Sequence, residues 1–145
     1  MHKKTLTLFL AALALLLCAS AARAEVEWLA TGPDGETQIV LWYFYSDTCP
    51  HCLEAKPFIA DLDARDWIDV RAFEITKNRD NGILYRDTAR AIGERARSVP
   101  AFIFCGTMHT GFDNAETTGA VLLARLEHCR ANPEEAIAMF TGANA

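Results

Sequence analysis

The chain has 145 residues, of which 51% are hydrophobic and 23% are charged, a length and composition typical of one globular domain. Its formal net charge at pH 7 is −5, from 14 basic and 19 acidic residues. Because phosphate backbones repel an acidic chain, we expect no nucleic-acid partner.

The first 24 residues have the three parts of a secretory signal. A basic start at residues 2–4 is followed by an apolar run over residues 6–17 and by the small-x-small sequence Ala22-Arg23-Ala24, which suits a signal peptidase. The run is shorter than the ~20 residues with which a helix spans a membrane. We therefore expect a cleaved signal peptide over residues 1–24, a mature domain over residues 25–145 and a periplasmic location.

The mature domain is more acidic than the whole chain. Removal of residues 1–24 takes away three basic residues and no acidic one, which leaves 11 basic and 19 acidic residues and a net charge of −8. Four of the five cysteines remain, at positions 49, 52, 105 and 129. An even number of cysteines in an exported protein indicates an oxidising compartment and at least one disulfide.

In chain order, a turn over residues 32–35 precedes a continuous apolar and aromatic run over residues 39–45, which predicts a buried central strand. Residues 46–48 have side chains that cap helices. A helix is expected from about residue 50 to residue 64. Its buried side is predicted to carry Leu53, Phe58, Ile59 and Leu62.

The second half of the chain adds three strands and three helices. We expect strands over residues 68–75, 101–104 and 108–112, helices over about 83–92 and 117–129, and a short last helix over about 132–140. Gly106-Thr107 joins the last two strands as a hairpin, and Val121, Leu122 and Leu126 share a helix face. This order predicts an α/β fold with a central mixed sheet of about four strands flanked by helices.

Cys49-Pro50-His51-Cys52 lies where the buried strand ends and a helix begins. The free N–H groups at a helix start favour a negative charge, so we expect the thiolate of Cys49 to be stabilised there, with help from His51. Cys52, one turn later, is expected to be more buried. Cys49 would then attack a disulfide and Cys52 would resolve the mixed disulfide, while Pro50 suits the first helical turn because it has no N–H to lose.

Two other interpretations of this motif are weaker. A structural bridge between Cys49 and Cys52 would close a very small loop and constrain the unfolded chain little. A zinc site would need Cys105 and Cys129 as its other half, and their separation of 24 residues lacks the spacing of a zinc knuckle. We therefore predict redox chemistry, with neither a metal nor another cofactor.

Over about residues 39–131 the chain resembles the thioredoxin superfamily. The resemblance is carried by the apolar strand, the Cys49–Cys52 motif, Pro57 eight residues after the first cysteine, and Val99-Pro100 before the hairpin. It implies a thioredoxin-like fold, a cis peptide bond at Pro100 facing the dithiol, and a substrate peptide that pairs with the backbone of Val99. In such strand addition the protein forms hydrogen bonds with the backbone of the substrate, so binding depends little on the substrate's sequence.

The dipeptide Pro50-His51 is similar to that of bacterial periplasmic disulfide-forming oxidases of the Dsb type, which implies a site that donates disulfides because its reduced form is stabilised. Those oxidases have a large helical insertion between the two cysteines and the cis-proline, whereas here Cys52 and Pro100 are only 48 residues apart, enough for one strand and one helix. Many members of the superfamily also bury an acid at the position of Tyr43, six residues before the first cysteine. The proton of the buried thiol would then move through water, Glu54 or Glu74, or the proton relay would be weak.

Cys105 and Cys129 are expected to form a structural disulfide. The strand after Pro100 leaves the active-site end, the hairpin returns, and the next helix runs away again, so its end lies near Cys105. Closing a loop of about 25 residues stabilises the fold by roughly 3.5 kcal/mol in the chain-entropy model. The alternative is a second exchange pair that passes electrons to the first.

These features predict a monomeric periplasmic thiol–disulfide oxidoreductase that acts on protein thiols or disulfides, in the oxidase or isomerase direction by preference. A membrane or soluble redox partner would recycle it. The alternatives are a copper-binding chaperone of thioredoxin fold, using Cys49, Cys52 and a histidine such as His109, or a reductant for one periplasmic partner. A solvated basic face that can also steer acidic partners is formed by Arg86, Arg90, Arg95 and Arg97.

Overall fold

The computed structural model describes residues 26–134 and 137. Its strands are β1 (Leu29–Thr31), β2 (Thr37–Tyr45), β3 (Ile68–Glu74), β4 (Ala101–Phe104) and β5 (Thr107–Thr110). Its helices are α2 (Pro50–Asp63), α3 (Arg79–Ala91), the single π-helical turn η1 (Ala115–Gly119) and α4 (Ala120–Ala131). The expected signal peptide and most of the expected last helix lie outside the described residues. Within those residues, no helix combines the length and apolar character needed to cross a membrane.

Strand β2 is the centre of a mixed sheet. Along its length it pairs in parallel with β3, and on its other edge it pairs antiparallel with β1 at its start and with β4 near its end. β5 pairs antiparallel with β4 as the outer strand of the hairpin. The expected combination of a parallel part and an antiparallel hairpin is confirmed, with β1 as a short additional strand.

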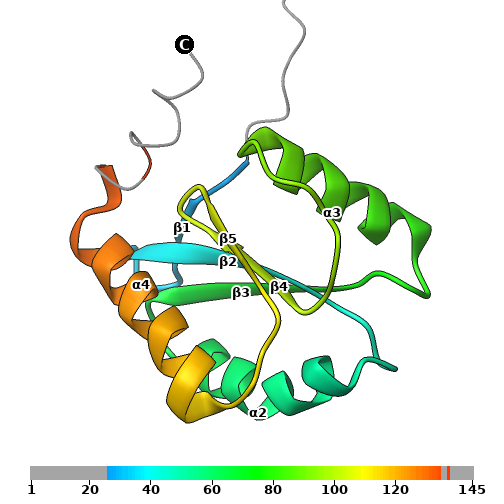
Figure 1. Cartoon of the computed structure of the whole chain (residues 1–145). Coiled ribbons are helices and arrows are strands. Elements are labelled where there is room, and N and C mark those ends of the chain that lie inside the picture. The colour runs from blue at the N-terminus through cyan, green and yellow to red at the C-terminus, as the bar shows by residue number, and fades with distance from the viewer. Residues whose placement is uncertain (1–25, 135–136, 138–145) are drawn as a thin grey trace, which may run out of the picture.

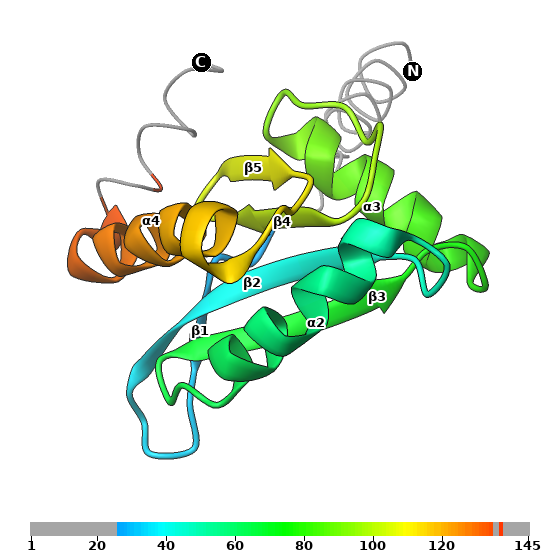
Figure 2. The ribbon, with the colours of Figure 1, turned by 60° about the horizontal axis from the view of Figure 1, so that its bottom comes forward.

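Helices cover both faces of the sheet, with α2 and α4 on one face and α3 on the other (Figures 1 and 2). The side chains of β2 explain both layers, because successive residues of a strand point to opposite faces. Ile39, Leu41 and Tyr43 belong to the core under α2 and α4, whereas Phe44 packs with Tyr85 of α3. This order of strands and helices is that of the thioredoxin-like α/β fold.

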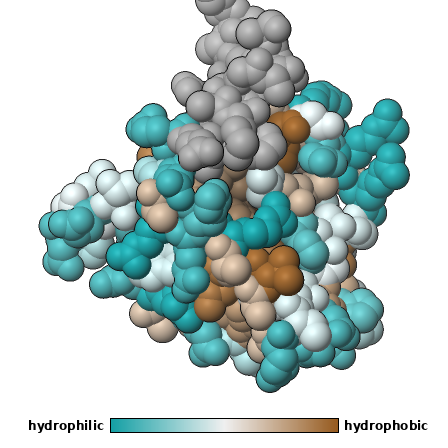
Figure 3. Space-filling view, turned by 60° about the vertical axis from the view of Figure 1, so that its left-hand side comes forward, coloured by the Kyte–Doolittle hydropathy of each residue, from teal (hydrophilic) through white to brown (hydrophobic). Residues whose placement is uncertain are grey.

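The predicted burial of two helical residues, Leu53 and Val121, is wrong. Leu53 and Val121 were expected on buried faces, but 48% and 53% of their surfaces are exposed. Adjacent residues of a helix point about 100° apart, so two neighbours cannot both point directly at the sheet. Cys52 and Leu122 take that place. On the face in Figure 3, strongly hydrophobic residues form a patch near the middle, with hydrophilic residues above it and to its left.

The turn of the hairpin lies one residue earlier than expected. Cys105 and Gly106, with φ angles of 46° and 70°, separate β4 from β5, a two-residue turn in which both residues have positive φ. Strand β5 correspondingly ends at Thr110, before Gly111 with φ of 87°. The turn places Cys105 at the end of the sheet opposite to the start of α2.

Candidate active site

Cys49 is the N-cap of helix α2 and its sulfur is part of the cap. The residue has an extended backbone, and its Sγ accepts a hydrogen bond from the backbone N–H of Cys52 at 3.4 Å. Pro50 follows in the first turn, as expected. The prediction that Ser46, Asp47 or Thr48 caps this helix is wrong, because that position belongs to Cys49.

Cys52 is a buried thiol and Cys49 a half-buried one; both are free. Cys52 has no exposed surface. Burial, followed by the hydrogen bond to Cys49, raises the pKa of Cys52 to about 12. The difference in exposure gives the pair one thiol that a partner molecule can reach and one that only Cys49 can reach.

Tyr43 occupies the position six residues before Cys49 at which the sequence has no acid, and its side chain contacts the backbone of Cys52. Its hydroxyl donates to the carbonyl oxygen of Cys52 at 3.4 Å. Burial first, and then the charge of Cys52, raise the pKa of Tyr43 far above its usual value, so at neutral pH it is a hydrogen-bond donor and not a base.

Glu54 and Glu74, the two acids proposed to carry the proton, are bound elsewhere. The Glu54 carboxylate lies 3.2 Å from Nδ1 of His51, and both side chains are more than half exposed. Glu74 accepts hydrogen bonds from the hydroxyl of Thr76 and from the backbone N–H of Lys77. Neither of these contacts leads to Cys52.

The segment before Pro100 lies beside the dithiol although it is 50 residues away in the sequence. The Val99–Pro100 peptide bond is cis, as the resemblance implied, and the thiol of Cys49 donates to the carbonyl oxygen of Val99 at 3.4 Å. Tyr85 of α3 holds the same segment, because its hydroxyl donates to the carbonyl oxygen of Ser98 at 2.8 Å. The sulfur of Cys49 therefore contacts both the start of α2 and the backbone before the cis-proline.

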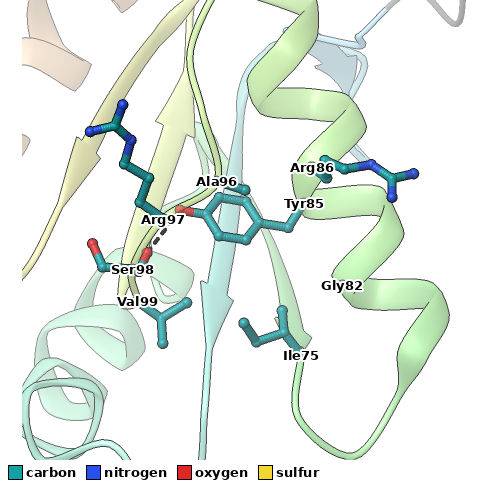
Figure 4. Close-up of a pocket in the computed structure, with 8 residues that line it drawn as sticks. All are labelled: Ile75, Gly82, Tyr85, Arg86, Ala96, Arg97, Ser98 and Val99. Atoms are coloured by element: carbon teal, nitrogen blue, oxygen red, sulfur yellow. Dashed lines mark hydrogen bonds between the residues drawn. The ribbon is translucent and has the colours of Figure 1, made fainter.

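A cavity next to Val99 was not found from the sequence, because the residues around it come from three separate segments. It has a volume of about 390 Å³ and lies between α3 and the segment that leads to Pro100 (Figure 4). The one sequence signal that pointed to this side of the molecule was the basic face of Arg86, Arg90, Arg95 and Arg97.

Cys105 and Cys129 are joined by a disulfide with a Cα–Cα distance of 6.5 Å, which is the expected pairing. Only 3% and 2% of the two residues are exposed. Strand β4 separates this bridge from the dithiol, since Ala101 at the start of β4 pairs with Phe44 near the end of β2 and Cys105 follows the other end of β4.

Among residues 26–134 and 137, no three His, Cys, Asp or Glu side chains are grouped so that they could hold a metal ion. His109 lies on β5, paired with Phe102, with their ring centroids 6.2 Å apart. Burial, and then Arg125, lower the pKa of His109.

No protein-family model matches the sequence, and no curated protein matches it significantly. One similar solved structure is that of the glutaredoxin Grx-1 from Archaeoglobus fulgidus. It is 17% identical, with a TM-score of 0.41, over 56% of this chain and 84% of that chain. The chemistry of the site is therefore inferred from its own geometry.

Proposed function

We propose that this protein is a thiol–disulfide oxidoreductase in which Cys49 is the attacking thiol and Cys52 the resolving thiol. One observation carries the proposal: the sulfur of Cys49 accepts the amide hydrogen of Cys52 and donates to the carbonyl oxygen of Val99. Disulfide exchange needs a reachable thiol that meets both a second thiol and a place where the substrate binds. The sulfur of Cys49 has both neighbours.

In the reductive direction, the Cys49 thiolate attacks one sulfur of a substrate disulfide. The substrate S–S bond breaks, and its other sulfur leaves as a thiolate that takes a proton from water. Cys52 then loses its proton and attacks Cys49 in the mixed disulfide, so a Cys49–Cys52 bond forms and the second substrate sulfur leaves. The protein gives two electrons to the substrate, and the reverse sequence donates a disulfide.

Substrate binding at Val99 is coupled to the first of these steps. In the thiol form, Cys49 donates a hydrogen bond to the carbonyl oxygen of Val99. Ionisation removes the hydrogen of this bond and leaves the oxygen without that donor. A backbone N–H of an extended substrate segment can replace it, which is the strand addition proposed for Val99 and Pro100. His51, whose side chain is 65% exposed, stands at the surface where the substrate arrives.

The cellular setting proposed here follows from the sequence. Residues 1–24 would direct export and be cleaved, and the monomeric mature domain would act in the periplasm on protein thiols or disulfides. A membrane or soluble redox partner would recycle it. The resemblance of Pro50-His51 to Dsb-type oxidases supports the oxidase or isomerase direction, which the reduction potential of the pair would test: about −120 mV is typical of an oxidant and about −270 mV of a reductant.

The Cys105–Cys129 bridge is proposed to be structural. A disulfide exchanges only with a thiolate that reaches one of its sulfurs. Because the two cysteines are almost completely buried and lie beyond β4 from the dithiol, burial supports a structural role over a second exchange pair.

Trapping of the mixed disulfide tests the proposal. Wild-type protein should reduce insulin and reactivate scrambled ribonuclease, and Cys49→Ser should do neither. Cys52→Ser should accumulate a covalent adduct between Cys49 and the substrate that dithiothreitol releases, as seen by mass spectrometry. Wild-type protein that fails in both assays but binds Cu(I) tightly would contradict the proposal and favour a copper chaperone.

A further inference from the structure

The arginines of the mature domain are concentrated next to the proposed active site. Residues 79–99, which form α3 and the segment that leads to Pro100, contain five arginines and three acidic residues, a net charge of +2. The remainder of residues 25–145 has six basic and sixteen acidic residues, a net charge of −10. A basic segment on a strongly acidic protein attracts an anionic partner to that side.

The cavity beside Val99 is lined mostly by residues of this basic segment. Its walls are formed by Ile75, Gly82, Tyr85, Arg86, Ala96, Arg97, Ser98 and Val99. Figure 4 shows the side chains of Ile75 and Val99 beneath the ring of Tyr85, with the guanidinium groups of Arg86 and Arg97 on opposite sides of that ring. The cavity thus combines an apolar wall with cationic margins.

Arg97 is the cation that a ligand can recruit. Nε of Arg86 already donates to the carboxylate of Asp87 at 3.2 Å. In contrast, the side chain of Arg97 is exposed and has no ion pair or hydrogen bond to another side chain in the described part of the chain. An unpaired guanidinium at the margin of a cavity is suited to a carboxylate, which it can bind through two hydrogen bonds.

The spacing connects Arg97 with the substrate segment. Arg97 precedes Val99 by two residues, so their Cα atoms are at most about 7 Å apart. A substrate strand that pairs with Val99 rises by about 3.3 Å per residue. A substrate residue two positions from the one beside Val99 can therefore come within reach of the Arg97 side chain.

We propose that this cavity is a subsite for an acidic side chain of the substrate polypeptide, close to the reacting cysteine. The inference rests on the proposed function and names its substrate class: proteins that have an aspartate or glutamate about two positions from the reacting cysteine. That cysteine is the substrate residue beside Val99, because the Cys49 sulfur to which it bonds contacts the carbonyl oxygen of Val99. The methylene groups of that side chain lie against Ile75 and Val99. Its carboxylate binds Arg97, and Arg86 adds to the attraction.

Matched peptides test this subsite. Each ten-residue peptide has one cysteine in a mixed disulfide with 2-mercaptoethanol, and Glu, Gln or Lys two positions before or after that cysteine. With reduced wild-type protein, in one of the two placements, the Glu peptide should react about two- to fivefold faster than the Gln peptide, the range of an exposed ion pair, and the Lys peptide more slowly. The difference should shrink at about 1 M salt, where charges are screened within roughly 3 Å.

Three variants make the test specific. Arg97→Glu should reverse the ranking of the Glu and Lys peptides. Arg95→Glu makes the same change of charge on the same segment but outside the cavity, and should keep the wild-type ranking. Gly82→Leu should reduce the preference by filling the cavity; a Cβ there would meet the carbonyl oxygen of Ile75 at 3.7 Å, an ordinary contact.

Equal rates for the three peptides in both placements would overturn the subsite, and so would the same reversal in Arg95→Glu as in Arg97→Glu. A larger dependence on Arg97 for glutathione disulfide than for the Glu peptide would also overturn it, since the cavity would then bind a small thiol. These outcomes leave exchange itself intact. Failure to react with any peptide and with hydroxyethyl disulfide would instead contradict the proposed function.

Discussion

Alkylation of Cys52 by iodoacetamide at pH 8 is expected to be about a thousandfold slower in the folded, reduced protein than in the same protein unfolded in guanidinium chloride. Cys52 has no exposed surface, and burial raises its pKa from an ordinary value near 9 to about 12. Because only the thiolate reacts, a rise of three pKa units lowers the rate by a factor of about 10³.

The assay follows the mass of peptides that contain each cysteine after timed alkylation and quenching. Cys49→Ser removes the faster thiol, so that Cys52 can be followed for hours. The substitution also removes the hydrogen bond between the two thiols, but burial, the larger cause of the shift, remains. Cys52 should therefore stay slow in folded Cys49→Ser and become fast when this variant is unfolded.

The same shift has an equilibrium consequence with a defined sign. A group whose pKa is higher in the folded state contributes stability below its unfolded pKa and loses it as the pH rises. The free energy of unfolding should therefore fall between about pH 9 and pH 12 more steeply in reduced wild-type protein than in Cys52→Ala. A folded-state alkylation rate within tenfold of the unfolded rate would refute the assignment of Cys52 as a shielded resolving thiol.

Three further changes test other parts of the structure. Replacing Cys105 and Cys129 by alanine should lower the free energy of unfolding in urea by roughly 3.5 kcal/mol, and a loss below about 1 kcal/mol would contradict the structural role. Gly119→Ala should cost about 1–2 kcal/mol because its Cβ would lie 3.1 Å from the ring of Phe58, and Phe58→Leu should relieve that cost. Burial lowers the pKa of His109 from 6.5, so the neutral ring contributes fully to the free energy of unfolding above pH 6.5, and this contribution is lost as the pH falls below it. The free energy of unfolding should therefore drop from pH 7 to pH 5 more in wild-type protein than in His109→Gln. An equal drop in both proteins would count against burial of the neutral ring.

The position of the dithiol was predictable because the sequence encodes the junction locally. An apolar run followed at once by capping residues and a proline is typical of a strand that ends where a helix begins. The capping residue was not predictable, because Ser46, Asp47 and Thr48 are all better caps than cysteine by type. Ser46 is instead buried, and its hydroxyl is hydrogen-bonded to the hydroxyls of Thr48 and Thr76. Thr76 follows the end of β3, so its contact with Ser46 forms only when β2 and β3 pair in the folded sheet.

Other features could not be predicted from the sequence for the same reason, since they depend on contacts between distant segments. The pattern of α4 offers both Val121 and Leu122 as core residues, and only packing against the sheet selects Leu122. A cysteine at the first position of a two-residue turn gives no signal, since asparagine, aspartate and glycine are the usual residues with positive φ there. The bridge from Cys105 to Cys129 was nevertheless predictable, because the direction of each element alone brings the two residues to one end of the sheet.

The environment of Cys52 bears on the direction of exchange under the proposed function. As a nucleophile Cys52 is almost fully protonated, and as a leaving group its raised pKa makes departure slow, so both reduction and disulfide donation pass through a difficult step at this residue. Tyr43 donates a hydrogen bond to Cys52 and supplies no base. The Cys49 sulfur, which is hydrogen-bonded to the Cys52 thiol, can no longer accept that proton once it has bonded to substrate. Under the proposed function, we therefore expect a mixed disulfide on Cys49 to last long enough for another cysteine of the substrate to attack it. This supports the isomerase direction within that proposal, because isomerisation needs no step at Cys52.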